Sequence, residues 1–429
     1  MSMNQFDKRG GADDKVLRGD SDNTRIGNIG DTLKVSAFMR PDPLSATYDS
    51  FGKLQVVVPQ VVYDVRFTNS LQPLVTTTNT ANSGTVTLAS EVSSAALNVT
   101  AANGSKALLQ SREYIHFQPG RTSLFYLAGK FSDSSVNRKQ RLGCFDNING
   151  LFFEYENSVL YVVTRTGVFG PPVDTRIAQS SWNIDKMDGT GVSGITLNPE
   201  LIQTYVIQTQ GHGSGSRLWG FNIGNEVFFV HKEDSANVSG IPWAATGDFP
   251  CRGEIINTAG GGTSTSLFIQ SFAALTGGES STAAITHAVN RNSDASINNG
   301  TFSPIISLRL KAATNRGILR VIQIPVLSTS TDNLEVRVVL NPSLTGASWT
   351  SAGANSIAEF DTSATSQTGG DVIDFFYVLE NGTSPVLELS SLVKLVSNYN
   401  GTADILTVAI RSADNSASAR AAIVYKELF

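Results

Sequence analysis

Short apolar or alternating runs, each cut by Gly, Asn, Asp or Ser, are the feature that most constrains the fold of this chain. In residues 333–341, Leu334, Val336 and Val338 alternate with polar residues, which predicts a strand with one buried face and one solvent-exposed face. Such runs predict many strands joined by tight turns. The other strands that the pattern predicts outside hairpins are at 54–58, 253–258, 266–275, 306–311, 318–327, 372–379, 384–389, 403–412 and 419–427.

Two pairs of runs predict β-hairpins. In residues 151–166, two segments rich in aromatic and β-branched residues flank a polar turn at 156–158. Residues 219–231 repeat this design around Gly224 and Asn225, which favour the positive φ angles of a tight turn. Both segments therefore predict antiparallel strand pairs.

Helical periodicity is scarce. The segments Ser280 to Val289 and Leu389 to Ser397 have the length of short helices, but neither carries a long apolar stripe. No repeat with a fixed period is visible, which weighs against a β-helix or a propeller. We expect an all-β chain of β-sandwich or jelly-roll-like domains in series, with an extended N-terminal arm.

The domain organisation follows from shifts in composition. The first 35 residues are charged, rich in glycine and poor in aromatic residues, so they bury too little apolar area to order themselves. Polar tracts indicate joints near 250 and 300. We expect a flexible arm at 1–35, a β-sandwich domain at 36–250, a β-rich connecting segment with long loops at 251–300 and a C-terminal β-domain at 301–429.

Composition excludes several classes of protein. The formal net charge is −5, so there is no bulk attraction to nucleic acid or to an anionic membrane, and we expect neither as a direct partner. The N-terminus lacks the apolar core of a secretory signal, and no apolar stretch approaches the roughly 18 residues of a spanning helix. We therefore expect synthesis in the cytoplasm without a secretory signal. Cys144 and Cys251 are expected to be buried thiols, with their pairing left open.

The motifs of common catalytic and metal sites are absent from the sequence. The four histidines lie too far apart for a local zinc ligand set, and no GxSxG motif is present. Residues 185–191 begin like a calcium loop, but Thr196 stands where the closing acidic residue is needed, so a structural turn is favoured. We expect no enzymatic activity, and neither catalytic residues, a metal nor a cofactor.

Several segments, including the hairpin at 218–231, carry a resemblance to known proteins. Residues 25–35, with the sequence RIGNIGDTLKV, resemble the start of structural proteins from tailed bacteriophages. Residues 179–197, 252–258 and 339–344 resemble a family of uncharacterised virion proteins from phages and environmental viral sequences. The resemblance extends from about residue 25 to residue 380 and transfers no catalytic residues.

The resemblance implies a structural component of a bacteriophage virion, in the tail, collar, baseplate or a head-decoration fibre. It implies that the chain works in the virion as a symmetric homo-oligomer with other virion proteins as partners. Flexible arms of such proteins become ordered on a neighbouring subunit. The candidate docking residues of the arm are Arg25, Ile26, Gly27, Asn28, Ile29, Leu33 and Val35.

Two other functional classes stay open. A receptor- or carbohydrate-binding virion protein without catalysis would stack aromatic rings on the sugars of a host-surface glycan. The candidates for such stacking are Trp182, Trp219, Trp243 and Trp349, each of which could instead pack in a core. A polysaccharide-degrading spike enzyme would need paired acidic residues and commonly shows repeated rungs, and the missing repeat counts against it.

Overall fold

The computed structural model describes residues 59–428 and the backbone of three short strands before them. The gaps in the described range are 133–134, 211–212, 225, 261–262, 279–283, 315 and 385–392. The three short strands pair antiparallel and are β1 (Phe6–Lys8), β2 (Lys15–Arg18) and β3 (Arg25–Ile26). Among the candidate arm residues, Arg25 and Ile26 form β3, whereas Gly27, Asn28, Ile29, Leu33 and Val35 lie outside the described residues, as does the strand expected at 54–58.

The all-β prediction is confirmed. In the described residues, the helical segments are three single 3-10 turns at Ser90–Val92, Gln179–Ser181 and Ala312–Thr314. The segment Ser280 to Val289 has the length of a short helix, but its described part from Thr286 onward belongs to a strand, β19 (Thr286–Asn290), that pairs with a later strand. No helix in the described part of the chain is long and apolar enough to cross a membrane.

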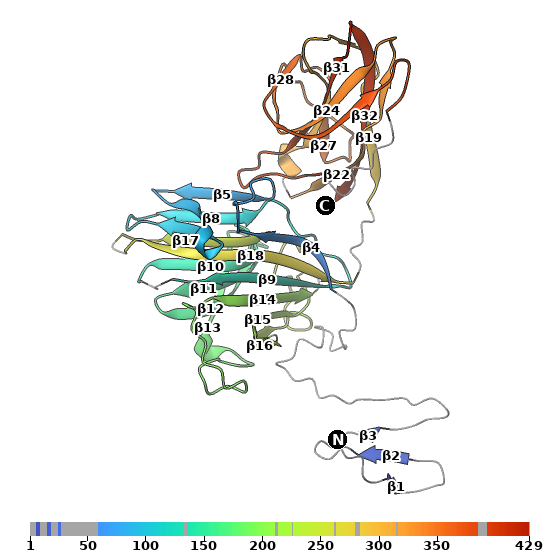
Figure 1. Cartoon of the computed structure of the whole chain (residues 1–429). Helices are drawn as coiled ribbons and strands as arrows, with labels where there is room; N and C mark the ends of the chain where they lie inside the picture. The colour runs from blue at the N-terminus through green and yellow to red at the C-terminus, as the bar shows by residue number, and fades with distance from the viewer. Residues whose placement is uncertain are drawn as a thin grey trace.

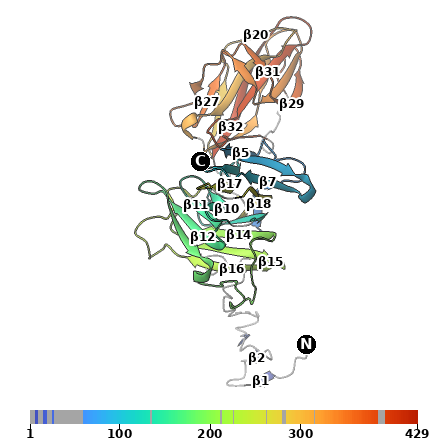
Figure 2. The same ribbon diagram turned by 90° about the vertical axis from the view of Figure 1, so that its left-hand side faces the viewer.

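The first unit is a sandwich of two antiparallel sheets, seen as two layers in Figure 2. One sheet has seven strands. In their order across the sheet these are β13 (Val173–Ala178), β12 (Val159–Thr166), β11 (Gly150–Glu156), β10 (Arg138–Phe145), β17 (Cys251–Asn257), β8 (Lys106–Ser111) and β5 (Thr76–Ala81).

The other sheet of this sandwich has eight strands. Seven follow one another in the order β16 (Glu226–Glu233), β15 (Arg217–Ile223), β14 (Gln203–Gln210), β9 (Thr122–Lys130), β18 (Thr265–Gly277), β7 (Ser94–Val99) and β6 (Thr85–Ala89). The eighth, β4 (Pro59–Arg66), also pairs with β18. Between the sheets lies a core rich in aromatic residues, in which Phe153, Tyr205 and Phe221 have ring centroids 5.1–5.3 Å apart.

Both predicted hairpins are confirmed. Asn157 and Ser158 join β11 to β12 with φ angles of 52° and 60°, which is the two-residue turn that suits the twist of antiparallel strands. β15 and β16 form the second hairpin, in which Gly224 has a φ of 62°. A bulge in the return strand shifts its register beyond Trp219, so that Val227 and Phe229 pack in a smaller cluster outside the main core.

The second unit is also a sandwich of two sheets around one core. One sheet consists of β26 (Thr350–Ser351), β27 (Ala358–Asp361), β21 (Ser303–Leu310), β31 (Ile405–Ser412), β24 (Leu334–Leu340) and β29 (Asp371–Val378). The other consists of β19, β32 (Ala417–Leu428), β22 (Ile318–Gln323) and β30 (Lys394–Leu395), with β20 (Ala295–Ile297) and β23 (Val326–Ser328) also paired to β32. A separate two-stranded sheet is formed by β25 (Ser343–Thr345) and β28 (Ser366–Thr368).

The domain boundaries differ from those expected at 250 and 300. β17 and β18 are central strands of the two sheets of the first sandwich, so this unit reaches residue 277. β19 and β20 pair with β32, so the second sandwich begins by residue 286. The expected connecting segment 251–300 is therefore divided between the two sandwiches, because strand pairing between distant segments overrides the local polar composition.

The two cysteines lie opposite each other in the middle of the first sandwich. Cys144 on β10 and Cys251 on β17 are cross-strand neighbours, and both are free thiols with no exposed surface. Burial raises the pKa of both thiols, because a thiolate loses its hydration in an apolar core.

We expect Cys144 and Cys251 to resist a thiol-reactive maleimide at pH 8 in the folded protein and to react fully in denaturant. The reason is that the nucleophile is the thiolate, which burial disfavours at both positions. Mass spectrometry should show no adduct in the native protein and two adducts after unfolding. Rapid labelling of the native chain would contradict the placement of these strands in the core.

Candidate functional site

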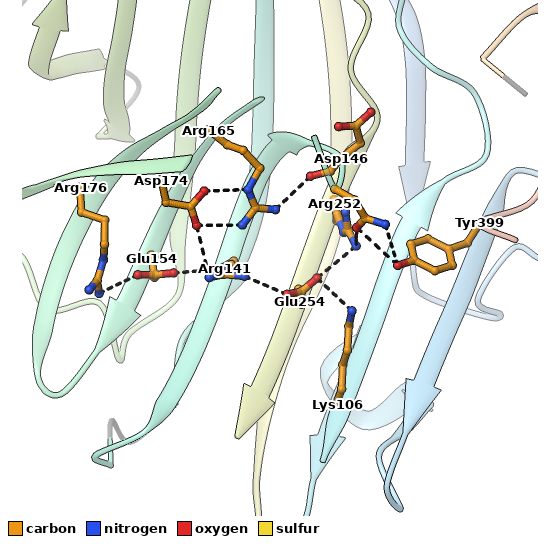
Figure 3. A network of polar contacts seen from close by, with 11 residues as sticks. Lys106, Arg141, Asp146, Glu154, Arg165, Asp174, Arg176, Arg252, Glu254 and Tyr399 are labelled. Carbon is orange, nitrogen blue, oxygen red and sulfur yellow. Dashed lines mark hydrogen bonds and ion pairs between the residues drawn. The ribbon is translucent and has the colours of Figure 1, made fainter. Parts of the chain in front are cut away.

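The outer face of the seven-stranded sheet carries a chain of ion pairs (Figure 3). At its centre, Arg141 on β10 lies directly opposite Glu154 on β11 and Glu254 on β17. Its Nε is 2.6 Å from Glu154 Oε2, and its Nη1 is 3.0 Å from Glu254 Oε1. One guanidinium thus connects three neighbouring strands.

The ion pairs continue to the edge strand β13. The Arg165 guanidinium binds both carboxylate oxygens of Asp174, at 2.7 and 2.9 Å, and donates to the backbone carbonyl of Asp146 at 3.0 Å. Arg176 Nη2 lies 2.6 Å from Glu154 Oε1. Glu154 is therefore held by two arginines from opposite sides, with no exposed surface.

In the other direction the network reaches β8. Arg252 Nη2 is 3.1 Å from Glu254 Oε2, and Lys106 Nζ is 3.6 Å from the same oxygen. Arg252 is fully buried and also donates to Asn147 Oδ1 at 2.9 Å. Arg141 Nη2 also lies 3.6 Å from Asp174 Oδ2, so the charged groups of six strands are linked in one continuous network.

Aromatic rings form the floor of the network. The centroids of Phe145 and Phe152 are 4.4 Å apart, and the Arg165 guanidinium lies 5.6 and 5.1 Å from them. Arg252 lies 5.0 Å from the ring of Phe145. Gly143 is required beside these rings, because a Cβ there would lie 2.5 Å from the backbone of Phe152.

The network sets the charge state of its members. Burial alone would raise the pKa of Glu254, but the charges of Arg252, Arg141 and Lys106 outweigh it and lower that pKa below its ordinary value. Burial would likewise raise the pKa of Asp174, and the hydrogen bonds and charge of Arg165 lower it. These carboxyl groups are therefore ionised and paired at neutral pH.

The network continues into the second sandwich through Tyr399. This ring lies 5.4 Å from the Arg252 guanidinium, and its Oη accepts a hydrogen bond from Asn147 Nδ2 at 3.1 Å (Figure 3). The Tyr399 backbone N–H donates to Thr77 Oγ1 on β5 at 3.3 Å. The polar face of one sandwich is thus part of the junction with the other.

Among the described residues, three ion pairs join the two sandwiches, which are stacked along one axis in Figure 1. Arg112 Nη2 is 2.6 Å from Asp404 Oδ1, and both side chains are almost fully buried. Lys394 Nζ lies 2.8 Å from both carboxylate oxygens of Glu113. The third pair is Arg316 with Asp146.

Two cavities flank this junction. One of about 550 Å³ is lined by residues of β5, including Thr77 and Thr78, and by the Arg112–Asp404 pair, and no aromatic residue lines it. The other, of about 650 Å³, is lined by His116 and His287 together with other residues of both sandwiches. Among the described residues, no group of three or more His, Cys, Asp or Glu side chains is arranged to hold a metal ion.

The structure corrects the placement of the glycan-stacking candidates. Trp182, Trp219 and Trp243 are 3%, 0% and 6% exposed, so they are core residues with no open ring face for a sugar. Trp349 is half-buried, and the Arg309 guanidinium covers its ring at 3.9 Å. A sugar that stacked on this face of the ring would have to displace the cation.

The motif at 185–191 closes one end of the first sandwich and does not offer oxygens to a cation. The buried Asp185 carboxylate accepts hydrogen bonds from the backbone N–H groups of Met187 and Ser193, both at 2.7 Å. Asp188 Oδ1 accepts from the backbone and hydroxyl of Thr190. The backbone N–H groups of Ile184 and Asp185 both donate to the carbonyl of Val230, which attaches this loop to β16.

A second polar cluster connects the two sheets of the first sandwich. Glu233 Oε2 accepts hydrogen bonds from Thr164 Oγ1 at 2.8 Å and from Arg217 Nε at 3.1 Å. Burial alone would raise the pKa of Glu233, but hydrogen bonding with His231, the charge of Arg217 and these two hydrogen bonds lower it to about 2. The carboxylate therefore contributes to the stability of this sandwich.

Sequence reasoning missed the charged network entirely. Its only local signal is the placement of Glu154 and Glu254 beside apolar residues, whereas Arg141 ends a polar stretch at 137–141. The ion pairs can be identified only once the strand register is known, because the register places the three residues side by side on neighbouring strands.

Replacement of Glu154 by Gln should lower the free energy of unfolding of the first sandwich by about 3 kcal/mol, because Arg141 and Arg176 would lose the fully buried carboxylate that they share. Chemical denaturation followed by tryptophan fluorescence measures this, since three of the four tryptophans lie in that sandwich. Asp234→Asn is the control, because Asp234 and Lys232 are 47% and 40% exposed and such pairs contribute less than about 1 kcal/mol. Equal effects of the two changes would contradict a structural role of the network.

The stabilising effect of Glu233 should depend on pH. Its pKa is lower in the folded state than its ordinary value of 4.5, so its contribution is complete above that pH and is lost as the pH falls toward 2. At pH 7, Glu233→Gln should cost about 3 kcal/mol. Urea denaturation at several pH values should show the variant and the parent converging between pH 4.5 and pH 2, and a constant difference would contradict the assignment.

No protein-family model matches the sequence, and a comparison with curated protein sequences gives no match. Solved structures with similarity include the CBM2 module of the evolved Dit of Lactobacillus casei BL23 phage J-1, at 10% identity over 51% of this chain and 95% of that chain, with a TM-score of 0.33. A β-1,3-glucanase from Mycobacterium marinum is 10% identical over 50% and 98%, with a TM-score of 0.36. A legume lectin-like domain from Entamoeba histolytica is 13% identical over 46% and 89%, with a TM-score of 0.26. At these values the similarities assign no function to this chain.

Proposed function

We propose that this chain is a non-catalytic structural component of a bacteriophage virion, in which two β-sandwiches act as one stiff body. The observation that supports this role is the ion-pair network, in which the charged groups of the sheet face bind one another and reach the second sandwich through Tyr399. Charged groups arranged in this way hold strands and domains in place and leave no reactive centre.

The state of the carboxyl groups supports a role without catalysis. Glycoside hydrolysis needs a carboxylic acid with a raised pKa opposite a second carboxylate. Glu154 is enclosed by Arg141 and Arg176, and the pKa of Glu254 is lowered. Among the described residues, each carboxyl group with a shifted pKa is shifted downward, namely Asp174, Asp188, Glu233, Asp234, Glu254 and Asp294.

Assembly requires surfaces that neighbouring subunits can use. β13 has one strand neighbour, β12, and its first residue, Val173, is 64% exposed. An extended segment can add to such an edge through backbone hydrogen bonds. We propose that the N-terminal arm of one subunit docks in this way on the next, within a symmetric homo-oligomer that also contacts other virion proteins.

Deletion of residues 1–35 should leave a folded body that fails to enter particles, because both sandwiches begin after this segment and the docking segment is lost. Circular dichroism should show an unchanged β spectrum, and electron microscopy with mass spectrometry of particles made with the variant should show its absence. A second measurement, the release of reducing ends from host polysaccharide, should be negative for the full chain. Normal incorporation of the deletion variant would refute arm docking, and turnover of polysaccharide would refute the non-catalytic role.

Binding of a host-surface glycan is the second candidate function. The four tryptophans do not support it, but the second sandwich has other aromatic rings that are exposed. Tyr377 and Phe375 on β29 are 63% and 39% exposed and belong to one continuous strand.

A further inference from the structure

β29 is an edge strand of the second sandwich (Figure 2), and it carries exposed aromatic side chains. Tyr377 and Phe375 alternate along this strand with Phe376 and Val378, which point into the core. The exposed pair is in contact, with ring centroids 5.1 Å apart and planes at 85°. Large exposed apolar groups gathered in one place indicate a binding surface.

Charged side chains complete this surface. The strand register places Tyr377 opposite Glu335 and Phe375 opposite Arg337 on β24. The Arg337 guanidinium lies 3.9 Å from the ring of Phe302 and 5.8 Å from the ring of Phe375. This cation therefore lies near two aromatic rings, of which Phe302 is also 4.7 Å from the Arg411 guanidinium.

Arg337 differs from its neighbour Arg411. Arg411 donates through Nε to Glu335 Oε2 at 3.1 Å, whereas Arg337 forms no ion pair with any of the described residues. The surface thus presents one guanidinium whose charge has no carboxylate partner. A stacked guanidinium keeps its N–H edge free, and that edge matches the two oxygens of a carboxylate.

The edge of β29 is poorly suited to strand addition. A bulge interrupts its pairing with β24 between Val338 and Val339. Asp374 Oδ1 accepts a hydrogen bond from the backbone N–H of Phe375 at 2.8 Å, which occupies a donor that an added strand could use. Bulges and edge charges of this kind protect against edge-to-edge pairing, which argues against a second copy of the chain as the occupant.

We infer that this surface, formed by Phe302, Arg337, Phe375 and Tyr377, binds a polysaccharide that carries carboxylates. The C–H face of a sugar ring stacks on Tyr377 and Phe375, and a uronate carboxylate binds Arg337. The net charge of the chain is −5, so the protein as a whole does not attract a polyanion electrostatically. The binding energy must therefore come from contacts at this local site. The inference rests on the second candidate function, glycan binding, and is independent of particle assembly.

The test is isothermal titration of the full chain with polygalacturonate, with dextran as a neutral comparison. The parent should bind polygalacturonate and not dextran. Arg337→Gln and Tyr377→Ala should each weaken binding about tenfold or more, and Arg337→Lys should weaken it as well, because lysine keeps the charge but loses the two-pronged geometry. Phe169→Ala is the matched control, since Phe169 is an aromatic residue of the first sandwich that is 82% exposed, and it should bind like the parent.

Several results would overturn the inference. These are no binding of polygalacturonate by the parent, equal binding of dextran, or parent-like binding by the Tyr377→Ala variant, whose ring is too exposed to be needed for folding. Self-association of the parent that this variant abolishes would show that the surface binds a second copy instead. Particle incorporation of Arg337→Gln should be normal, which separates failure of this site from failure of the proposed structural role.

Discussion

The pairing of buried charges around Arg141 is the interaction on which the rest of the architecture depends. Its guanidinium meets Glu154 and Glu254 in one row across three strands, and the same network continues to the edge strand and to Tyr399 of the second sandwich. Replacing such pairs by apolar residues can be neutral for stability, whereas removing one partner is costly. Their physical effect is therefore to specify one register and one domain arrangement, which is what a subunit of fixed shape requires.

Local patterns in the sequence predicted the elements that local physics determines. The alternation at Leu334, Val336 and Val338 predicted a strand with one buried face, and all three side chains are in the core. The turn between β11 and β12 was predicted from polar residues at 156–158, and Asn157 and Ser158 adopt the required positive φ angles. These features depend on residues that are neighbours in the sequence, so one amino-acid sequence is enough to predict them.

Features that depend on distant residues could not be predicted in this way. Arg141 and Glu254 are 113 positions apart, and their ion pair follows only from the register of β10 with β17. For the same reason β17 and β18 appeared to follow a domain boundary, although they complete the first sandwich. The tryptophans illustrate a related limit, because an amphipathic ring suits both a core and a ligand surface, and only the tertiary packing decides between them.

The position of β17 and β18 in the chain has a consequence for biosynthesis. These strands lie between β10 and β8 and between β9 and β7, so each of them is the central piece that joins two separated halves of a sheet. While the ribosome is still translating the earlier strands, those halves have unpaired inner edges and an uncovered aromatic interior. The nascent chain can bury this interior only after residue 277 has emerged from the ribosome. Until then it is an aggregation-prone intermediate with exposed apolar surface, which a holdase chaperone would protect.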